Sequence, residues 1–425
     1  MHPRLIALFA ALSGHGVVWT LLRVPRNPEL PPGDVDLLVR PEDLTAFDAV
    51  ARDAGFVALP GWDAPPSLLY FALDEDAGRF VVLDVADRVV FGARDQYPTS
   101  VAAGVLDRRV PDGDAFRPAP DDEFWLLLLH CLLDKGTVPD HYRDRLEAGA
   151  RSASTDSALP KFLAAIQVDV DALRSAAARG DWSALLAQAA PLAAAWTHSV
   201  PRMERAAQRW RRLRRVLGRP ALLPRRRGIT VALLGPNGAG KSTLAHGIGE
   251  SFPLPVAQIY MGLWKTGASE PTALRQLADA AARPFRAWGR LARAMGHQAR
   301  GHLVVFDRYV DDARRPAAPP LRAVKRIYFW LLSRAVPRPD VSLLLDLPAA
   351  VAHGRKAENS LAETEVERTE YLALRAQLPL HVLDASRPAA EVRGQALAVV
   401  WRAYRSRFAR VELPAPAREP VEPRP

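Results

Sequence analysis

The stretch that decides the fold of the C-terminal half reads Gly235-Pro236-Asn237-Gly238-Ala239-Gly240-Lys241-Ser242-Thr243. It matches the phosphate-binding pattern G-x-x-x-x-G-K-[ST] at every position. A short apolar run at residues 229–234 predicts a strand before it, and residues 244–250 predict a helix after it. Because the pattern requires this strand–loop–helix context, the sequence predicts a nucleoside triphosphate site.

The chemistry of such a loop explains its residue types. Glycines let successive backbone N–H groups turn toward phosphate oxygens, and the helix start adds the positive end of its dipole. We expect Lys241 to reach the β- and γ-phosphates and Ser242 to bind Mg²⁺. The alternative is a glycine-rich turn without a ligand, and nine fitting residues weigh against it. The predicted cofactors are therefore ATP and Mg²⁺.

Residues 343–348 separate two enzyme classes that share this loop. They resemble the second nucleotide motif of transporter-type ATPases, which needs a glutamate after Asp346 to activate water. The residue at that position is Leu347, and no LSGGQ-like signature lies between Lys241 and Asp346. The transporter-ATPase interpretation is therefore the minor alternative.

Residues 303–309 favour a kinase. They form an apolar run that ends in Asp307-Arg308-Tyr309 and resembles the DR[YH] motif of thymidylate kinases. At the end of a parallel strand, Asp307 would orient the acceptor or hold a Mg²⁺-bound water. Arg308 would bridge donor and acceptor phosphates with its planar fork. The predicted activity is that of a phosphotransferase.

Two later segments extend the resemblance to about residues 228–405. Residues 339–348 resemble a strand of the same family that leads into a mobile lid, which implies that Arg355 and Lys356 close over the transferring phosphate. Arg368, further along, is a third candidate for this role. The alternative for all three residues is a solvated helix face, and for Arg368 we favour that alternative. Residues 383–388 resemble the family's loop beside the adenine, which implies that Ala385 contacts the base.

The sequence also departs from the thymidylate kinase pattern. The family carries an acidic residue in the phosphate loop that contacts the substrate sugar, where this chain has the neutral Asn237. The family's R-E-P-G substrate segment is absent, and residues 260–265 occupy that region. The expected acceptor is a nucleotide or another small phosphorylated compound, and not thymidylate itself.

Residues 33–39, which contain Asp34 and Asp36, resemble the D-h-[DE] strand of polymerase-β-type nucleotidyltransferases. Strand alternation puts both carboxylates on one face, where they can share Mg²⁺. Asp84 would be the third carboxylate of a two-metal site. However, residues 20–24 occupy the place of the family's glycine pair. Three interpretations remain open: an active nucleotidyltransferase, a degenerate domain that only binds a ligand, and two aspartates that merely lie at the start of a strand.

The length of 425 residues suits several domains. We predict an α/β protein whose residues 218–410 form a P-loop NTPase unit, a parallel sheet in a three-layer α/β/α arrangement. Residues 1–118 are expected to be an α+β nucleotidyltransferase-like domain and residues 119–217 a helical connector. Residues 411–425, rich in proline and charge, are expected to be a disordered tail.

The single cysteine, Cys131, excludes an internal disulfide and favours a reducing compartment. Its apolar helical surroundings predict a buried structural thiol. No apolar run approaches the length of a membrane span, and we reject residues 5–12 as an export signal because no cleavage site follows. We therefore expect a cytoplasmic protein.

Charge is unevenly distributed. Residues 1–120 contain 11 Arg against 17 Asp or Glu, whereas the whole chain carries a net charge of +10. Residues 202–228 hold eleven arginines against one acid and could bind a polyanion or an anionic membrane surface. An arginine-rich linker helix is the favoured interpretation, and the lack of interleaved aromatics argues against nucleic acid.

Two further function classes stay open beside the kinase. One is an ATP-binding module that docks a polyanion or a membrane through residues 202–228, with a degenerate first domain. The other is a bifunctional nucleotidyltransferase–kinase. The kinase resemblance also implies a homodimer formed through helices of residues 218–410, and the sequence leaves the oligomeric state open.

Overall fold

The computed structural model describes residues 1–23, 33–58, 67–92, 96–199, 228–261, 273–311, 336–355 and 360–408. The chain divides into two compact units. Unit 1 takes in Met1–Ala72 and Val81–Leu217, and unit 2 takes in Leu73–Phe80 and Gly218–Arg410. Within the described ranges, no helix combines the length and the apolar character needed to cross a membrane.

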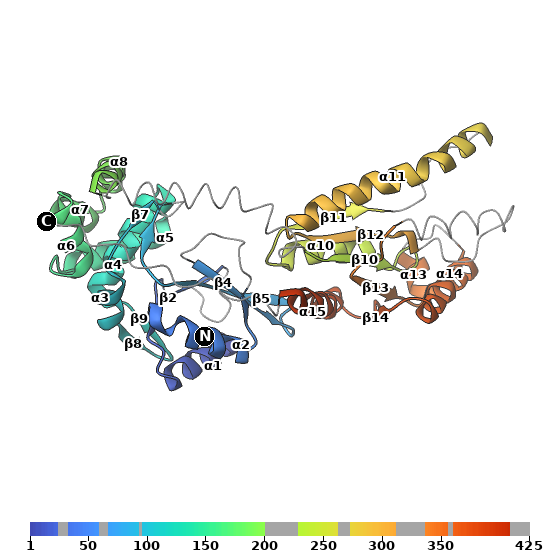
Figure 1. The fold of residues 1–425 in the computed structure, drawn as a ribbon, viewed down its shortest axis with the longest axis horizontal. Helices are drawn as coiled ribbons and strands as arrows, with labels where there is room; N and C mark the ends of the chain where they lie inside the picture. Colours follow the sequence, from blue (N-terminus) through green and yellow to red (C-terminus); the bar gives the residue numbers. More distant parts are fainter. Residues whose placement is uncertain are drawn as a thin grey trace. The chain divides into compact units, whose positions relative to one another are not determined.

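The first part of unit 1 is a five-stranded mixed sheet with short helices (Figure 1). Its elements are α1 (Pro3–Gly14), β1 (Trp19–Leu21), β2 (Val35–Val39), η1 (Pro41–Asp43), α2 (Leu44–Asp53), β3 (Val57–Ala58), β4 (Ser67–Asp74) and β5 (Arg79–Ala86). The strand order is β1-β2-β5-β4-β3. β1 runs antiparallel to β2, whereas β2 and β5 are parallel and set Asp36 directly opposite Asp84.

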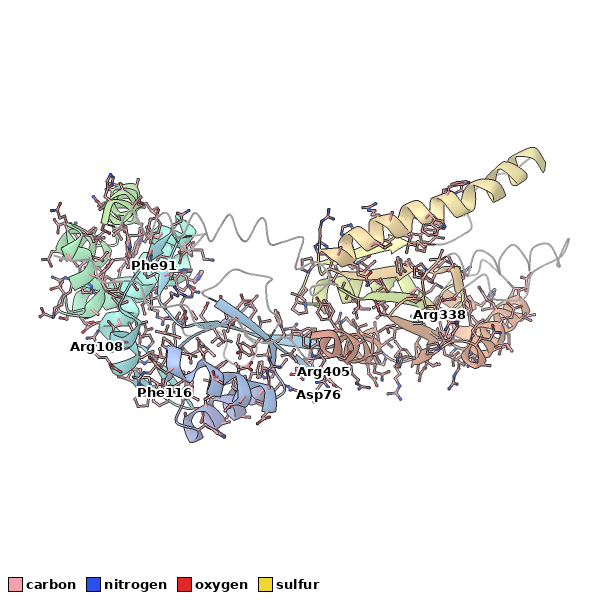
Figure 2. The ribbon with its side chains drawn as sticks, in the orientation of Figure 1. Asp76, Phe91, Arg108, Phe116, Arg338 and Arg405 are labelled. Carbon is pink, nitrogen blue, oxygen red and sulfur yellow. The ribbon has the colours of Figure 1, made fainter. Side chains whose placement is uncertain are left out.

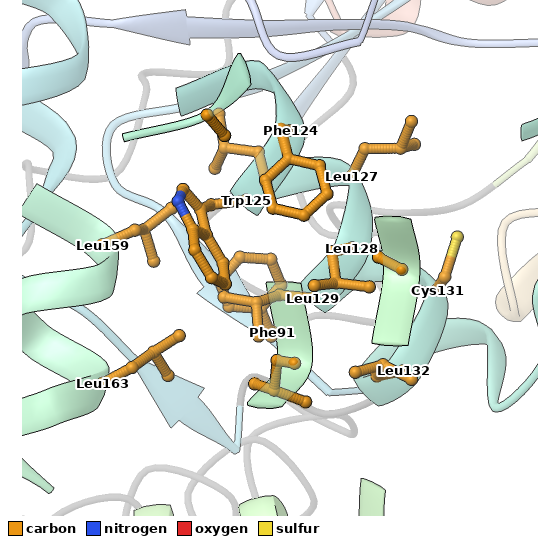
Figure 3. Packing of buried hydrophobic residues seen from close by; sticks show 14 of the residues in the cluster. Phe91, Phe124, Trp125, Leu127, Leu128, Leu129, Cys131, Leu132, Leu159 and Leu163 are labelled. Carbon is orange, nitrogen blue, oxygen red and sulfur yellow. The ribbon is translucent and has the colours of Figure 1, made fainter. Parts of the chain in front are cut away.

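The second part of unit 1, as far as residue 199, is mainly helical. Its elements are β6 (Val90–Phe91), β7 (Tyr97–Pro98), α3 (Ala102–Asp107), β8 (Val110–Asp112), β9 (Ala115–Arg117), α4 (Pro120–Leu129), the π-helical turn η2 (His130–Lys135), α5 (Asp140–Ser152), α6 (Ala158–Ala165), α7 (Val170–Ala178) and α8 (Trp182–Ser199). Leucine and aromatic side chains of α4 pack against Leu159 and Leu163 of α6 (Figure 3). Cys131 is buried in the same cluster, which confirms the predicted burial of the thiol.

Two buried clusters stabilise unit 1. Phe91 belongs to the helical cluster, whereas Phe116 packs on the cluster beneath the mixed sheet (Figure 2). There the ring of Phe116 meets Trp19 edge-on at a centroid distance of 5.6 Å. Arg109 stacks its guanidinium 4.8 Å from the centre of the Phe116 ring. Apolar burial of this kind is the main favourable term in folding.

Unit 2 is built on one parallel sheet, which confirms the predicted α/β character of the C-terminal half. Its elements are β10 (Thr230–Leu234), α10 (Lys241–Ser251), β11 (Val256–Tyr260), α11 (Ala273–Ala299), β12 (Leu303–Asp307), β13 (Val341–Asp346), α13 (Ala349–Arg355), α14 (Leu361–Ala373), η4 (Leu374–Ala376), β14 (Leu380–Asp384) and α15 (Ala389–Phe408). The strand order is β11-β12-β10-β13-β14, and every neighbouring pair is parallel.

Helices cover both faces of the unit 2 sheet (Figure 1). Ala232 and Leu234 of β10 belong to the cluster that contains residues of α11 and α14. Because side chains alternate along a strand, Val231 and Leu233 face the opposite side, where α10 and α15 pack on the sheet and on each other. Three α/β/α layers result. The carboxyl ends of the parallel strands, where such sheets bind ligands, carry Asp307 and Asp346.

The predicted domain boundaries at residues 118 and 217 stay predictions. Residues 1–72 and 81–199 fall in one compact unit, so the mixed sheet and the helices behind it are described together. The predicted tail at residues 411–425 and the arginines at residues 202–227 lie outside the described residues.

Candidate functional site

The loop between β10 and α10 has the backbone of a phosphate cradle. Gly235, Gly238 and Gly240 take φ values of 140°, 81° and 90°, a region that favours glycine. A Cβ at Gly235 would lie 2.7 Å from the carbonyl oxygen of Leu345, and a Cβ at Gly238 equally close to that of Ala352. Close packing as well as conformation therefore requires glycine at positions 235 and 238, whereas at Gly240 only the positive φ favours it.

Lys241 begins α10 and turns its ammonium group back into the loop. Its Nζ donates hydrogen bonds of 2.7 Å to the carbonyl oxygens of both Gly235 and Pro236. The residue is only 7% exposed. A buried charge has to be hydrogen-bonded to be stable, so these carbonyls hold the cation at the loop.

Ser242 and Asp307 are 65 residues apart in sequence and adjacent in the structure. The Ser242 hydroxyl donates to Asp307 Oδ2 at 2.6 Å. This brings a hydroxyl oxygen and a carboxylate oxygen together at the loop, and Mg²⁺ prefers oxygen ligands of this kind. The two residues predicted to bind the metal in unit 2 thus fit that ion.

Arg308 follows β12 and adopts a φ of 69°, which is uncommon for a residue other than glycine. Its Nη2 donates to the Oδ1 of Asn237 in the phosphate loop. The backbone N–H of Asn237 in turn donates to Glu367 Oε2 of α14 at 3.4 Å. Tyr309 is buried and donates its hydroxyl hydrogen to the Pro337 carbonyl at 2.5 Å, so this tyrosine anchors the strand end.

A cavity of about 590 Å³ opens at the carboxyl end of the sheet. It is lined by Asn237, Gly238, Gly240, Lys241, Ser242, Thr243, Tyr260, Asp307, Arg308 and Arg355. A second cavity of about 220 Å³ adjoins it and shares Gly240, Thr243 and Arg355. Ala239, Ala385 and Arg387 line this second cavity. The predicted phosphate-side and base-side residues in the described ranges therefore line two cavities that share part of their walls.

The predicted lid residues have different outcomes. Arg355, the last residue of α13, lines both cavities, whereas Lys356 lies outside the described residues. The expectation that Arg368 lies on a solvated helix face is wrong. Its Nε and Nη2 donate to the two carboxylate oxygens of Asp346 at 2.6 and 3.1 Å. This hydrogen bond, with the charge of Asp346, raises the pKa of Arg368.

The pairing of Asp346 bears on the transporter-ATPase alternative. In that interpretation Asp346 precedes a residue that activates water, yet both of its oxygens accept hydrogen bonds from Arg368. The following residue, Leu347, is fully buried. The geometry at the end of β13 is thus that of a structural ion pair.

Two residues that line the cavities, and one that contacts the phosphate loop, were not predicted from the sequence. Tyr260 ends β11 opposite Asp307 in the strand register. Arg387 lines the second cavity, and Glu367 reaches the phosphate loop from α14. Tyr260 could have been predicted as a site residue from its position at the carboxyl end of a parallel strand. No local pattern distinguishes Glu367 from the other acids of its helix.

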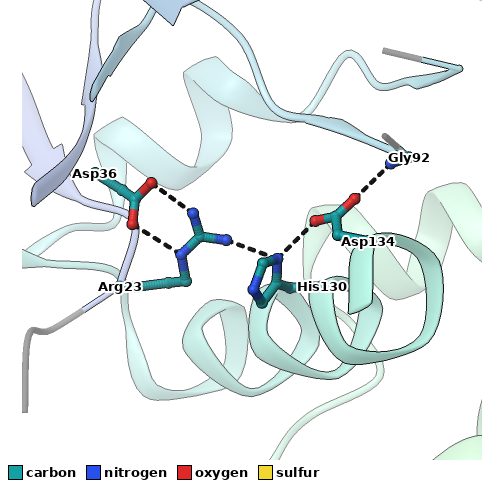
Figure 4. Close-up of polar contacts among 5 residues, drawn as sticks. All are labelled: Arg23, Asp36, Gly92, His130 and Asp134. Carbon is teal, nitrogen blue, oxygen red and sulfur yellow. Dashed lines mark hydrogen bonds and ion pairs between the residues drawn. The ribbon is translucent and has the colours of Figure 1, made fainter. Parts of the chain in front are cut away.

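In unit 1, the predicted carboxylates have an unexpected neighbour. Asp36 and Asp84 are opposite each other on β2 and β5, and Asp34 lies just before β2. Arg23 forms a two-pronged ion pair with Asp36 and also contacts His130 (Figure 4). Among the described residues, no group of three or more His, Cys, Asp or Glu side chains is arranged to hold a metal ion. Metal binding by Asp34, Asp36 and Asp84 stays a prediction.

Comparisons with known proteins concern less than half of the chain. No family model matches it. The thymidylate kinase of Xanthomonas campestris pv. campestris (strain B100) is 32% identical over 204 residues, which cover 43% of this chain and 86% of the relative. That of Xanthomonas oryzae pv. oryzae (strain PXO99A) is 29% identical over 208 residues, covering 44% and 89% respectively.

A solved structure of thymidylate kinase from Candida albicans is similar over 42% of this chain and 93% of its own, with 16% identity. Its TM-score of 0.33 is too low to carry a conclusion about fold. The family assignment rests on the sequence relatives and not on this structure. Because a relative that is 32% identical is matched over 86% of its length, the chain belongs to the thymidylate kinase family.

Proposed function

We propose that the chain is an ATP- and Mg²⁺-dependent phosphotransferase that transfers the γ-phosphoryl group of ATP to a nucleotide or another small phosphorylated acceptor. One observation carries the proposal. The phosphate loop, the Ser242–Asp307 pair and Arg308 line a single cavity at the carboxyl ends of parallel strands. Kinship with thymidylate kinases supports the same reaction class.

In this proposal the residues act by position and charge. Lys241 turns from its loop carbonyls to the donor phosphates, and backbone N–H groups of the loop bind phosphate oxygens. Asp307 orients the attacking oxygen of the acceptor, while Arg308 and Arg355 face the transferring group. Mg²⁺, held by Ser242 and Asp307, would neutralise negative charge on the phosphates. Catalysis then comes from alignment and electrostatic stabilisation.

The second cavity supports a purine on the donor side. Its volume of about 220 Å³ adjoins the loop, and its lining includes apolar Leu244, Leu345 and Ala385. Arg387 and Arg393 contribute charged edges. Apolar walls with a few polar groups suit a base that has to be both stacked and oriented.

The acceptor side supports a substrate other than thymidylate. The neutral Asn237 occupies the loop position where the family has an acid, and it already accepts a hydrogen bond from Arg308. Tyr260 forms part of the cavity wall in the region where the family's R-E-P-G segment is expected. Different side chains at these two places imply different contacts to the acceptor.

A screen of acceptors tests the proposal. The protein is incubated with γ-labelled ATP, Mg²⁺ and panels of nucleoside monophosphates, nucleosides and sugar phosphates. We expect at least one phosphorylated acceptor to yield a labelled product and to raise ADP formation above the level with ATP alone. Normal ATP binding without acceptor-dependent ADP formation from any compound would refute the kinase assignment.

We infer in addition that the first part of unit 1 has a nucleotidyltransferase-like fold. The support is its mixed sheet, in which parallel β2 and β5 set Asp36 opposite Asp84. α2 and the Gly55-Phe56 pair follow β2 along the chain. This inference concerns the fold of unit 1, since function depends on the site that a fold carries.

A further inference from the structure

Arg23 is fixed against Asp36 by both backbone and side chain. It follows β1, and the N–H of the preceding Leu22 donates to the Asp36 carbonyl oxygen at 2.9 Å. The guanidinium donates two hydrogen bonds to the Asp36 carboxylate, from Nε to Oδ2 at 2.9 Å and from Nη2 to Oδ1 at 2.5 Å (Figure 4). Two parallel bonds of this kind make the strongest and most directional ion pair available to a carboxylate.

On the side away from Asp36, the guanidinium of Arg23 faces the π-helical turn η2. Arg23 Nη1 lies 2.7 Å from His130 Nδ1, and that nitrogen lies 2.6 Å from Asp134 Oδ2. The other oxygen of Asp134 accepts the backbone N–H of Gly92 at 2.5 Å. One ring nitrogen cannot both accept from Arg23 and donate to Asp134, so the guanidinium is fixed by its bonds to Asp36 of β2 and lies against His130 of the π-helical turn η2, all within unit 1.

The guanidinium stays charged in this setting. The Arg23 and Asp36 side chains are only 30% and 18% exposed. An arginine guanidinium keeps its proton in proteins, whatever its neighbours. A permanent positive charge therefore lies on the carboxylate that a divalent metal would need.

A metal ion and this guanidinium compete for the same oxygens. In a two-metal nucleotidyl transfer site, carboxylates on neighbouring strands share the cations. Asp36 and Asp84 have the right strand register, yet both Asp36 oxygens already accept hydrogen bonds from Arg23. A cation at Asp36 would have to displace the Arg23 guanidinium from both carboxylate oxygens or lie beside its positive charge. The residues present therefore do not fit a metal centre at this carboxylate.

We propose that the Arg23 guanidinium takes the place of the divalent cation in unit 1, and that this unit binds no catalytic metal. The Arg23–Asp36 pair then acts as a fixed internal link between β1, β2 and η2. Residues 20–24, where the nucleotidyltransferase pattern has a glycine pair, supply the arginine itself. The same replacement would remove both the room for a triphosphate and the site for its metal.

Binding of Mn²⁺ to the full-length protein without nucleotide tests this proposal. The background variant Ser242→Ala with Asp307→Ala removes the metal site proposed for unit 2, so that Mn²⁺ bound by the protein reports on unit 1. Bound ion is measured from the loss of the paramagnetic resonance signal of free Mn²⁺. Metal affinities are compared in this background alone and with each of four further changes: Asp36→Asn, Arg23→Ala, Arg23→Lys, and Arg23→Ala plus Asp36→Asn.

We expect the background protein to bind no Mn²⁺ that depends on Asp36. Arg23→Ala should raise Mn²⁺ affinity by at least about tenfold, the size of effect that groups next to metal ligands have. Adding Asp36→Asn should abolish that gain. Arg23→Lys keeps a cation beside Asp36 and should bind no more Mn²⁺ than the background.

Two results would overturn the proposal. One is Mn²⁺ binding by the background protein that Asp36→Asn removes, since the arginine would then not exclude the metal. The other is a folded Arg23→Ala variant that gains no Mn²⁺ affinity. Circular dichroism shows whether each variant is folded. If Arg23→Ala does not fold, Mn²⁺ binding by the background protein with and without Asp36→Asn still tests whether the arginine excludes the metal.

Discussion

At the phosphate loop, Asn237 determines how Arg308 enters the cavity. Its side-chain oxygen accepts a hydrogen bond from the guanidinium, and its backbone N–H is held by Glu367. Arg308 itself has a left-handed backbone, a conformation that costs free energy and persists only where surrounding contacts fix it. Asn237 is therefore a positioning residue for an arginine proposed to contact the transferring phosphate.

Changing Asn237 should alter acceptor kinetics more than ATP binding. Asn237→Asp adds a negative charge beside Arg308, so we expect the acceptor KM to rise by roughly tenfold, an effect of about 1.4 kcal/mol. Asn237→Ala releases the guanidinium and should lower kcat instead. Steady-state kinetics with an acceptor from the screen measure both. His246→Ala, which changes an exposed side chain on α10 just after the loop, is the control. Equal kinetics in wild type and Asn237→Asp would contradict this role.

Cys131 should be inert in the folded protein. Burial in the cluster around α4 raises the pKa of its thiol to about 11, so little thiolate exists near neutral pH. We expect no modification by iodoacetamide at pH 8 in the native protein, and full modification after unfolding in urea. Mass spectrometry of the intact chain reads out both. Rapid alkylation under native conditions would show that the π-helical turn at residues 130–135 opens readily.

At the scale of elements, the Arg368–Asp346 pair ties α14 to the end of β13. The two side chains are 26% and 24% exposed, so solvent screens the pair in part. We expect Arg368→Ala to lower the free energy of unfolding by about 1–2 kcal/mol, because Asp346 loses both of its guanidinium bonds. Urea denaturation measures the change, and Arg375→Ala on the exposed turn after α14 is the matched control.

A double-mutant cycle checks that the two residues act together. If they do, Arg368→Ala should cost little in an Asp346→Asn background. Additive losses from the two changes would mean that α14 is held mainly by its apolar contacts with the sheet, such as those of Tyr371 and Leu374.

Local patterns predicted the elements better than their connections. The apolar runs that end at Asp307 and Asp346 are strands in the structure, and the glycine loop leads into α10 as its pattern requires. The contacts of Arg23 with Asp36 and of Arg368 with Asp346 were not predicted. Their partners lie 13 and 22 residues apart, and no periodicity specifies which charges meet after folding. The sequence therefore predicted the strands and the loop on the phosphate side of the site, but not the ion pairs that connect distant segments of each unit.

On the scale of the whole molecule, each unit has its own buried core. A ligand that binds only the folded form of unit 2 should therefore stabilise that unit alone. At 100 times its Kd, ATP with Mg²⁺ adds about 2.7 kcal/mol to the stability of the unit that binds it. We expect calorimetry to show one transition moved upward by ATP and another unchanged. An equal shift of the whole profile would contradict independent unfolding.

The central claim is that unit 2 transfers a phosphoryl group to an acceptor, and Asp307 separates this claim from mere ATP binding. Asp307 lies on the acceptor side of the proposed reaction and beside Ser242, whereas Lys241 lies within the phosphate loop. We therefore expect Lys241→Ala to lose both ATP affinity and turnover. Asp307→Ala should still bind ATP while acceptor-dependent turnover falls by at least about 10²-fold.

The deciding measurement is ATP affinity by titration calorimetry together with acceptor-dependent ADP formation, on wild type, Lys241→Ala and Asp307→Ala. Arg308→Lys provides a further comparison, since a point charge cannot bridge two phosphates as a guanidinium does. We expect Asp307→Ala to keep its affinity for ATP and to lose acceptor-dependent turnover. Near-normal acceptor-dependent turnover in Asp307→Ala would contradict it.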